Sequence, residues 1–151
     1  MLVSVLSLGL AGCTQIEPSL HPVLANEQLG KWYSGALRHP KAHPAFQQFS
    51  DAYHGDSNAL RAYFAEALTQ SESEKINAAG GEELMWTLEI LLSRLGDQRF
   101  ADALAKETSR AQSAVGGFIH TQFLRSYPKT QKILHDSPKI IFPLSKAYGN
   151  S

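Results

Sequence analysis

The chain has 151 residues, 43% hydrophobic and 19% charged, as in an ordinary globular protein that can bury a sizeable core. Its 14 basic and 14 acidic side chains cancel, which disfavours nucleic-acid binding and a purely electrostatic hold on a membrane. The single cysteine excludes an intrachain disulfide and a zinc site built from several cysteines.

An apolar run opens the chain at Leu2 and closes with Leu10-Ala11-Gly12-Cys13. The run is too short to cross a bilayer as a helix, but it suits the core of a signal peptide. Its last four residues resemble the lipobox of bacterial lipoproteins, where a signal peptidase cuts before a cysteine that carries lipid. The resemblance implies that residues 1–12 are a signal peptide and that Cys13 is lipidated. The alternative is an apolar N-terminal strand or helix.

Residues 13–25 are polar and contain Pro18 and Pro22, which predicts a tether between the lipid and the folded part. In enterobacterial lipoproteins, an aspartate directly after the lipidated cysteine favours retention in the inner membrane. The resemblance places Thr14 at this position, which implies an outer membrane lipoprotein facing the periplasm. Residues 26–151 are predicted to form a single helical domain.

The first two helices are predicted on either side of a proline-rich loop. Asn26 is a candidate N-cap, and apolar residues follow it at helical spacing as far as Leu37. Residues 38–44 predict a loop, because Pro40 and Pro44 each bias the preceding residue away from the helical region. Pro44 suits the first turn of a second helix, which would bury Phe46, Phe49 and Tyr53.

The strongest apolar stripe of the sequence follows a pair of glycines. Residues 69–79 predict a loop that contains a helical turn, and Gly80-Gly81 predicts a break in the helical structure before Glu82. The stripe that follows consists of Leu84, Met85, Leu88, Leu91, Leu92 and Leu95. We expect this helix to be central. In the last third, Gly116-Gly117 indicates either a kink or a close helix contact, and Pro128 starts a last short helix before an apolar tail at residues 140–142.

Two glycine-aspartate pairs, Gly55-Asp56 and Gly96-Asp97, lie 41 residues apart, and each is expected to end one helix and cap the next. Arrays of helix pairs repeat at about 40 to 47 residues. The stretch from Leu95 to Leu104, followed by Ala114-Val115, resembles a HEAT repeat. The chain is therefore predicted to be all-α, either a compact helical bundle or a short HEAT-like array of about six to seven helices.

One sequence pattern is similar to a known catalytic block. Gly55-Asp56-Ser57, preceded by Asp51 and His54, resembles the nucleophile block and the Asp-x-x-His pair of the Gly-Asp-Ser-Leu hydrolases. The order of the residues is reversed relative to that family, and Asn58 stands in place of its leucine. A helix cap explains the aspartate and the serine fully, so we predict no catalytic residue from this pattern.

No metal site or cofactor is predicted either. His39 and His43 lie four residues apart, but the prolines that follow each of them break the helix that would bring both to one metal ion. Charge is uneven along the chain, since residues 51–107 contain eleven acidic and five basic side chains. The basic residues from Thr121 onward indicate a solvated face or a contact with anionic lipid or an acidic partner.

The favoured function is a noncatalytic, lipid-anchored periplasmic module that binds an envelope protein or assists envelope assembly, including an inhibitor or immunity-type role. Trp32, Tyr53 and Tyr63 lie near predicted turns and are the predicted partner-binding anchors, although each suits the core equally well. The alternative is an envelope hydrolase with a site assembled from dispersed residues, for which the candidates are His54, Glu89, Asp102 and His120.

Overall fold

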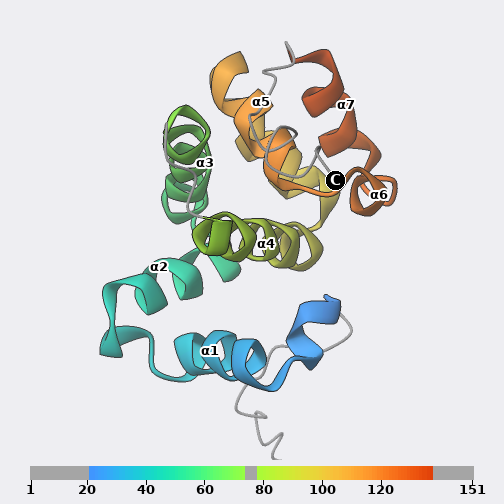
Figure 1. Ribbon diagram of the computed structural model, residues 1–151. Helices are drawn as coiled ribbons and strands as arrows, with labels where there is room; N and C mark the ends of the chain where they lie inside the picture. The colour runs from blue at the N-terminus through green and yellow to red at the C-terminus, as the bar shows by residue number, and fades with distance from the viewer. Residues whose placement is uncertain (1–20, 74–77, 138–151) are drawn as a thin grey trace, which may run out of the picture.

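The computed structural model describes residues 21–73 and 78–137 (Figure 1). Within these two ranges the regular elements are seven α-helices and two 3-10 helices, with no strand. The prediction of an all-α fold with six to seven helices is therefore confirmed. The predicted signal peptide, Cys13 and the apolar tail lie outside the described residues.

The central helix α4 has other helices on both of its sides (Figure 1). Helices α1 and α2 lie on one side, and α3, α5 and α7 lie on the other. In chain order the elements are η2 (Pro22–Ala25), α1 (Glu27–Arg38), η3 (Pro40–Ala42), α2 (Pro44–Tyr53), α3 (Ser57–Glu72), α4 (Ala78–Leu104), α5 (Ser109–Phe118), α6 (Thr121–Leu124) and α7 (Pro128–Asp136).

Two predicted caps are present. The Asn26 side-chain oxygen accepts hydrogen bonds from the backbone N–H groups of Gln28 and Leu29, at 3.0 and 3.2 Å. The Asp56 carboxylate accepts one from the Ala59 N–H at 2.8 Å. Each cap satisfies a backbone donor that the first turn of a helix leaves free, so α1 and α3 begin where the sequence indicated.

The second glycine-aspartate pair does not act like the first. Gly55 and Gly96 both have positive φ, 95° and 78°, which glycine adopts readily, and Gly96 divides α4 into two helical parts. The Asp97 carboxylate, however, accepts hydrogen bonds from Lys129 and Thr130 in the first turn of α7, both at 2.8 Å. The prediction that Asp97 caps the next helix in the chain is wrong, because a tertiary contact uses its carboxylate. The 41-residue repetition therefore no longer supports a HEAT-like array.

Two other glycine pairs lie where helices pack closely. Gly80 and Gly81 belong to α4, so the prediction of a break before Glu82 is wrong. A Cβ atom at Gly81 would lie 3.7 Å from the Phe118 ring on α5, and one at Gly116 would lie 3.5 Å from the Leu134 side chain on α7. Both distances are ordinary van der Waals contacts, and α5 continues through Gly116-Gly117 without a break, which favours the helix-contact interpretation of this pair over a kink.

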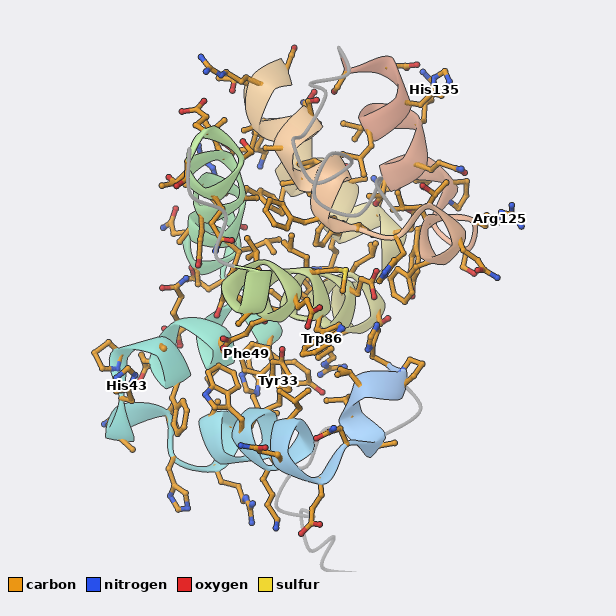
Figure 2. All side chains as sticks on the ribbon, viewed as in Figure 1. Tyr33, His43, Phe49, Trp86, Arg125 and His135 are labelled. Atoms are coloured by element: carbon orange, nitrogen blue, oxygen red, sulfur yellow. The ribbon has the colours of Figure 1, made fainter. Side chains whose placement is uncertain are left out.

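The apolar stripe of α4 forms the centre of the core, as predicted. Leu88, Leu91 and Leu92 have no exposed surface. They belong to one buried cluster with aromatic residues of the surrounding helices, including Tyr33 and Phe49, which lie between α1, α2 and α4 in Figure 2. Burial of this stripe against helices on both sides explains why α4 is central.

The folded part begins before Asn26, the first residue of the predicted domain. Residues 22–25 form η2, which packs on α1 and buries Leu24. His21 is buried as well. The end of the segment predicted as a tether is therefore packed on the helical domain, because Leu24 and His21 find partners there.

The contact between η2 and α1 predicts that Gly30→Ala destabilises the fold by about 1 to 3 kcal/mol, the usual range for overpacking. A Cβ atom at Gly30 would lie 2.6 Å from the backbone oxygen of Leu24, so η2 would have to move. Gly35→Ala in the same helix is the control, because its Cβ would meet only the Phe46 ring, at 3.9 Å. In urea unfolding, the Gly35→Ala variant should be as stable as the parent protein or more stable. Equal free energies of unfolding for Gly30→Ala and Gly35→Ala would contradict the close contact between Gly30 and Leu24.

Candidate functional site

A polar stripe runs along α4 beside the apolar one. Glu89 and Ser93 lie one turn apart on the first part of α4, Asp97 follows the break at Gly96, and each of the three side chains contacts the C-terminal third of the chain. The Ser93 hydroxyl lies 3.0 Å from that of Tyr127, and Asp97 caps α7 as described above. The stripe therefore fixes the last helices of the described chain onto α4.

Glu89 is the most buried member of this stripe, with 1% of its surface exposed. Its Oε2 atom lies 2.5 Å from Nε2 of His21. Its Oε1 atom accepts the backbone N–H of His120 at 2.9 Å and lies 2.8 Å from the Nδ1 atom of the same ring. Nδ1 of His21 accepts the N–H of Val23, so the proton of His21 is on Nε2 and points to Glu89. The buried carboxylate thus joins η2, α4 and the α5–α6 linker.

Two carboxylates of the polar stripe have lowered pKa values. Burial raises the pKa of Glu89, but the hydrogen bonds from His21 and from the backbone and ring of His120 together hold it below its ordinary value. Burial also raises the pKa of Asp97, and the N–H groups of Lys129 and Thr130 outweigh this effect and lower it. Both groups therefore stabilise the fold in their charged form.

These directions predict acid destabilisation. A carboxylate with a lower pKa in the folded state contributes stability above its unfolded pKa, about 4, and this contribution is lost as the pH falls through the folded value. The free energy of unfolding, measured with urea, should decrease below a pH of about 4.5. Glu89→Gln should make this decrease shallower, whereas Glu82→Gln, at an exposed position of α4, should keep it. An unchanged pH dependence in Glu89→Gln would contradict the assignment.

The structure joins two of the four residues named for the alternative hydrolase. Glu89 and His120 are hydrogen-bonded, as described above. The His54 ring is hydrogen-bonded to the backbone oxygen of Ser50 at 2.7 Å, and Asp102 accepts a hydrogen bond from the Gln98 side chain. Both residues therefore bond to neighbours in their own part of the chain, and not to Glu89 or His120. In the described part of the chain, no group of three or more His, Cys, Asp or Glu side chains is arranged to hold a metal ion.

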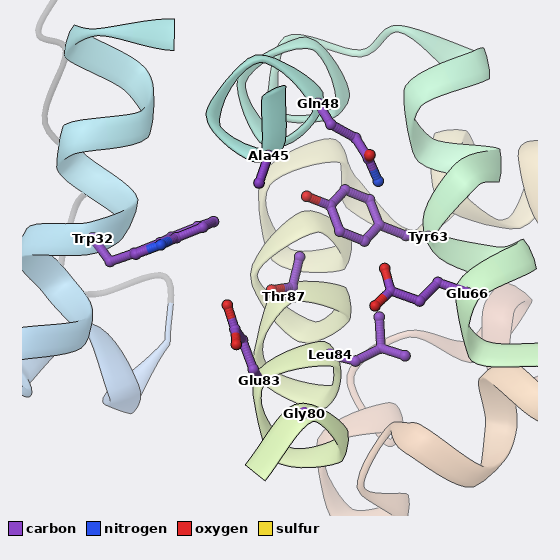
Figure 3. Close-up of a pocket in the computed structure, with 9 residues that line it drawn as sticks. All are labelled: Trp32, Ala45, Gln48, Tyr63, Glu66, Gly80, Glu83, Leu84 and Thr87. Carbon is purple, nitrogen blue, oxygen red and sulfur yellow. The ribbon is translucent and has the colours of Figure 1, made fainter. Parts of the chain in front are cut away.

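A pocket of about 180 Å³ lies where α1, α2, α3 and α4 meet (Figure 3). Pockets for drug-sized ligands measure about 300 to 1,000 Å³, so this one suits a single side chain. Its lining consists of Trp32, Ala45, Gln48, Tyr63, Glu66, Gly80, Glu83, Leu84 and Thr87.

Two of the three predicted anchors, Trp32 and Tyr63, line this pocket, where they point toward one another from α1 and α3 (Figure 3). Trp32 is half-buried and packs edge-on against Phe46, with 5.3 Å between ring centroids. Tyr53 is not part of the pocket. Its buried ring lies under the Arg94 guanidinium, 5.0 Å from the ring centroid, so its place is in the core.

The pocket is acidic. Glu66 on α3 and Glu83 on α4 are exposed, and within the described residues neither carboxylate pairs with a basic side chain. Burial raises the pKa of Tyr63, and Glu66 and Glu83 raise it further, so this hydroxyl stays protonated. Burial likewise raises the pKa of Tyr33 to about 12, against the lowering effect of its hydrogen bond with Thr87. The pocket therefore has a negative potential.

Glu66, Glu83 and Gln48 were not identified from the sequence. They come from three helices, and each resembles an ordinary solvated polar residue in its own helix. The convergence of α2, α3 and α4 brings them together, and no spacing in the sequence encodes it.

The fold and the pocket define an all-α helical protein with a small acidic pocket. Comparisons with protein-family models, curated proteins and solved structures found no match to this chain. No helix within residues 21–73 and 78–137 is long and apolar enough to cross a membrane.

Proposed function

We propose that the protein is a lipid-anchored envelope module that binds a protein partner and catalyses no reaction. The pocket where α1, α2, α3 and α4 meet carries this proposal, because it gathers Trp32 and Tyr63, two of the anchors that the sequence predicts. Tryptophan and tyrosine beside a pocket commonly dominate the energy of protein interfaces. The size of the pocket suits one inserted side chain of the partner.

The membrane anchor in this proposal is supported by the sequence alone. The lipobox-like residues Leu10-Ala11-Gly12-Cys13 favour an outer membrane lipoprotein that faces the periplasm. Cys13→Ser should abolish acyl labelling and release the protein from the membrane fraction, because the attached lipid supplies the membrane affinity. A parent protein that stays in the cytoplasm with its N-terminus intact would rule out this location.

Crosslinking in intact cells tests the partner. A photoreactive residue in place of Gln48, which lines the pocket, should capture one specific envelope protein. The same residue in place of His135, which is exposed on α7, a helix that contributes no residue to the pocket lining, should not capture it. Trp32→Ala should weaken the capture, and Trp32→Phe should keep more of it at an unchanged melting temperature. Capture of the same abundant proteins from both positions would contradict the proposal.

One observation favours the alternative hydrolase. The buried Glu89 carboxylate is hydrogen-bonded to the ring of His120, whose side chain is 59% exposed. In nucleophilic catalysis, an acidic residue orients a histidine base in the same way. Here the carboxylate also binds His21 and the His120 backbone, which indicates a structural role. Turnover of a generic ester or peptidoglycan substrate that is lost in His120→Ala would favour the hydrolase over the binding module.

A further inference from the structure

We propose that the acidic pocket receives the cationic end of a lysine or arginine side chain from the partner. This inference rests on the proposed function and names the kind of residue that the partner inserts. It follows from three features of the pocket that come from different helices: two carboxylates without a basic partner among the described residues, the Tyr63 hydroxyl, and the apolar walls.

Neither carboxylate at the pocket forms an ion pair within the described residues, as is also true of the exposed Glu82 and Asp102, and what distinguishes the two is that they line one pocket. Four other carboxylates each pair with a basic side chain of this chain: Glu27 with Lys31, Glu72 with Arg110, Glu107 with Arg61, and Asp136 with Lys132. Glu66 receives only the uncharged amide of Gln70, at 3.1 Å. For Glu83 the described residues supply no ion-pair partner. A single inserted cation would therefore meet two uncompensated negative charges.

The Tyr63 hydroxyl is a further polar group at the pocket. The residue is 7% exposed, and its hydroxyl is directed into the pocket (Figure 3). No described group forms a hydrogen bond with it, whereas the neighbouring Tyr33 hydroxyl lies 3.0 Å from that of Thr87. Among the described residues no buried side-chain N or O atom lacks a hydrogen-bond partner, so the Tyr63 hydroxyl is open to the pocket and can be reached by an inserted group. An ammonium or guanidinium N–H group would supply the donor that Tyr63 can accept.

The apolar walls suit the stem of such a side chain. Trp32, Ala45 and Leu84 line the pocket together with the acidic residues. Lysine and arginine bury their methylene groups along apolar surface while the charged end finds polar partners, and an indole ring attracts cations. An anionic side chain would be repelled by both carboxylates, and a neutral one would leave them uncompensated.

Titration of the full-length protein with N-acetyl-lysine methylamide and its arginine equivalent tests this inference. The Trp32 indole N–H signal, followed by NMR, should shift saturably with at least one of the two probes. The norleucine equivalent has a similar stem without the charge and should bind about tenfold more weakly, equal to about 1.4 kcal/mol. Affinity for the cationic probe should also fall as salt is added. Equal binding of the norleucine probe would overturn the inference.

Matched variants assign the effect to the pocket. Glu83→Gln and Glu66→Gln should each weaken binding of the cationic probe several-fold, whereas Glu82→Gln, one residue outside the lining, should leave it unchanged. Equal binding in all three variants would overturn the inference. If the Gln48 crosslinker still captures a partner while no cationic probe binds, the proposed function stands and the charge preference falls. If a probe binds but no partner is captured, the charge preference stands and the protein-binding function falls.

Discussion

Replacement of Glu89 by alanine is expected to lower the free energy of unfolding by about 3 to 5 kcal/mol, the range for removing one member of a buried charged cluster. The loss leaves the ring N–H of buried His21 and the backbone N–H of His120 without their acceptor. It also opens a cavity under η2 and the α5–α6 linker. The free energy of unfolding of a typical domain is about 5 to 15 kcal/mol, so this single change should remove a large part of the stability of the fold.

Urea unfolding of Glu89→Ala beside Glu82→Ala measures the effect. Glu82 is exposed on the same helix, so its replacement should change the free energy of unfolding by less than about 0.5 kcal/mol. Glu89→Ala and His21→Ala should be non-additive when combined, because they remove the same hydrogen bond. A cost below about 1 kcal/mol for Glu89→Ala would show that the cluster does not hold the fold together.

Leu88→Ala is expected to cost about 2 to 5 kcal/mol, the range for truncating a fully buried leucine to a methyl group. Leu88 has no exposed surface, and α4 packs against helices on both of its sides, so neighbouring side chains have little freedom to fill the space. The loss combines the transfer free energy of the missing atoms with the free energy of the cavity they leave.

The matched control is Met85→Ala, which truncates a half-buried side chain of the same apolar stripe. Its cost should be clearly smaller, because part of the lost surface is already in contact with water. Thermal and urea unfolding of both variants would give the comparison. If Leu88→Ala costs no more than Met85→Ala, α4 is not the centre of the core.

The sequence identified part of the pocket for a reason unrelated to pockets. Trp32 and Tyr63 are predicted anchors because they are aromatic residues near predicted turns, but they lie in the middle of α1 and α3, so the packing of these helices and not a turn brings them to the pocket. Tyr53 satisfied the same criterion and lies in the core. Residue type and spacing do not distinguish an aromatic ring at a pocket from one that fills the interior.

The sequence by itself determined the helical class, the first caps and the central stripe of α4, because each depends on residues within one or two helical turns. Asn26, Asp56 and Gly96 act locally, and the leucines of α4 share one face at helical spacing whatever their neighbours are. Only the tertiary structure decided the roles of Asp97, Glu89 and the pocket carboxylates. Their partners are distant in the sequence, and a hydrogen bond or ion pair between separate helices depends on how the helices pack.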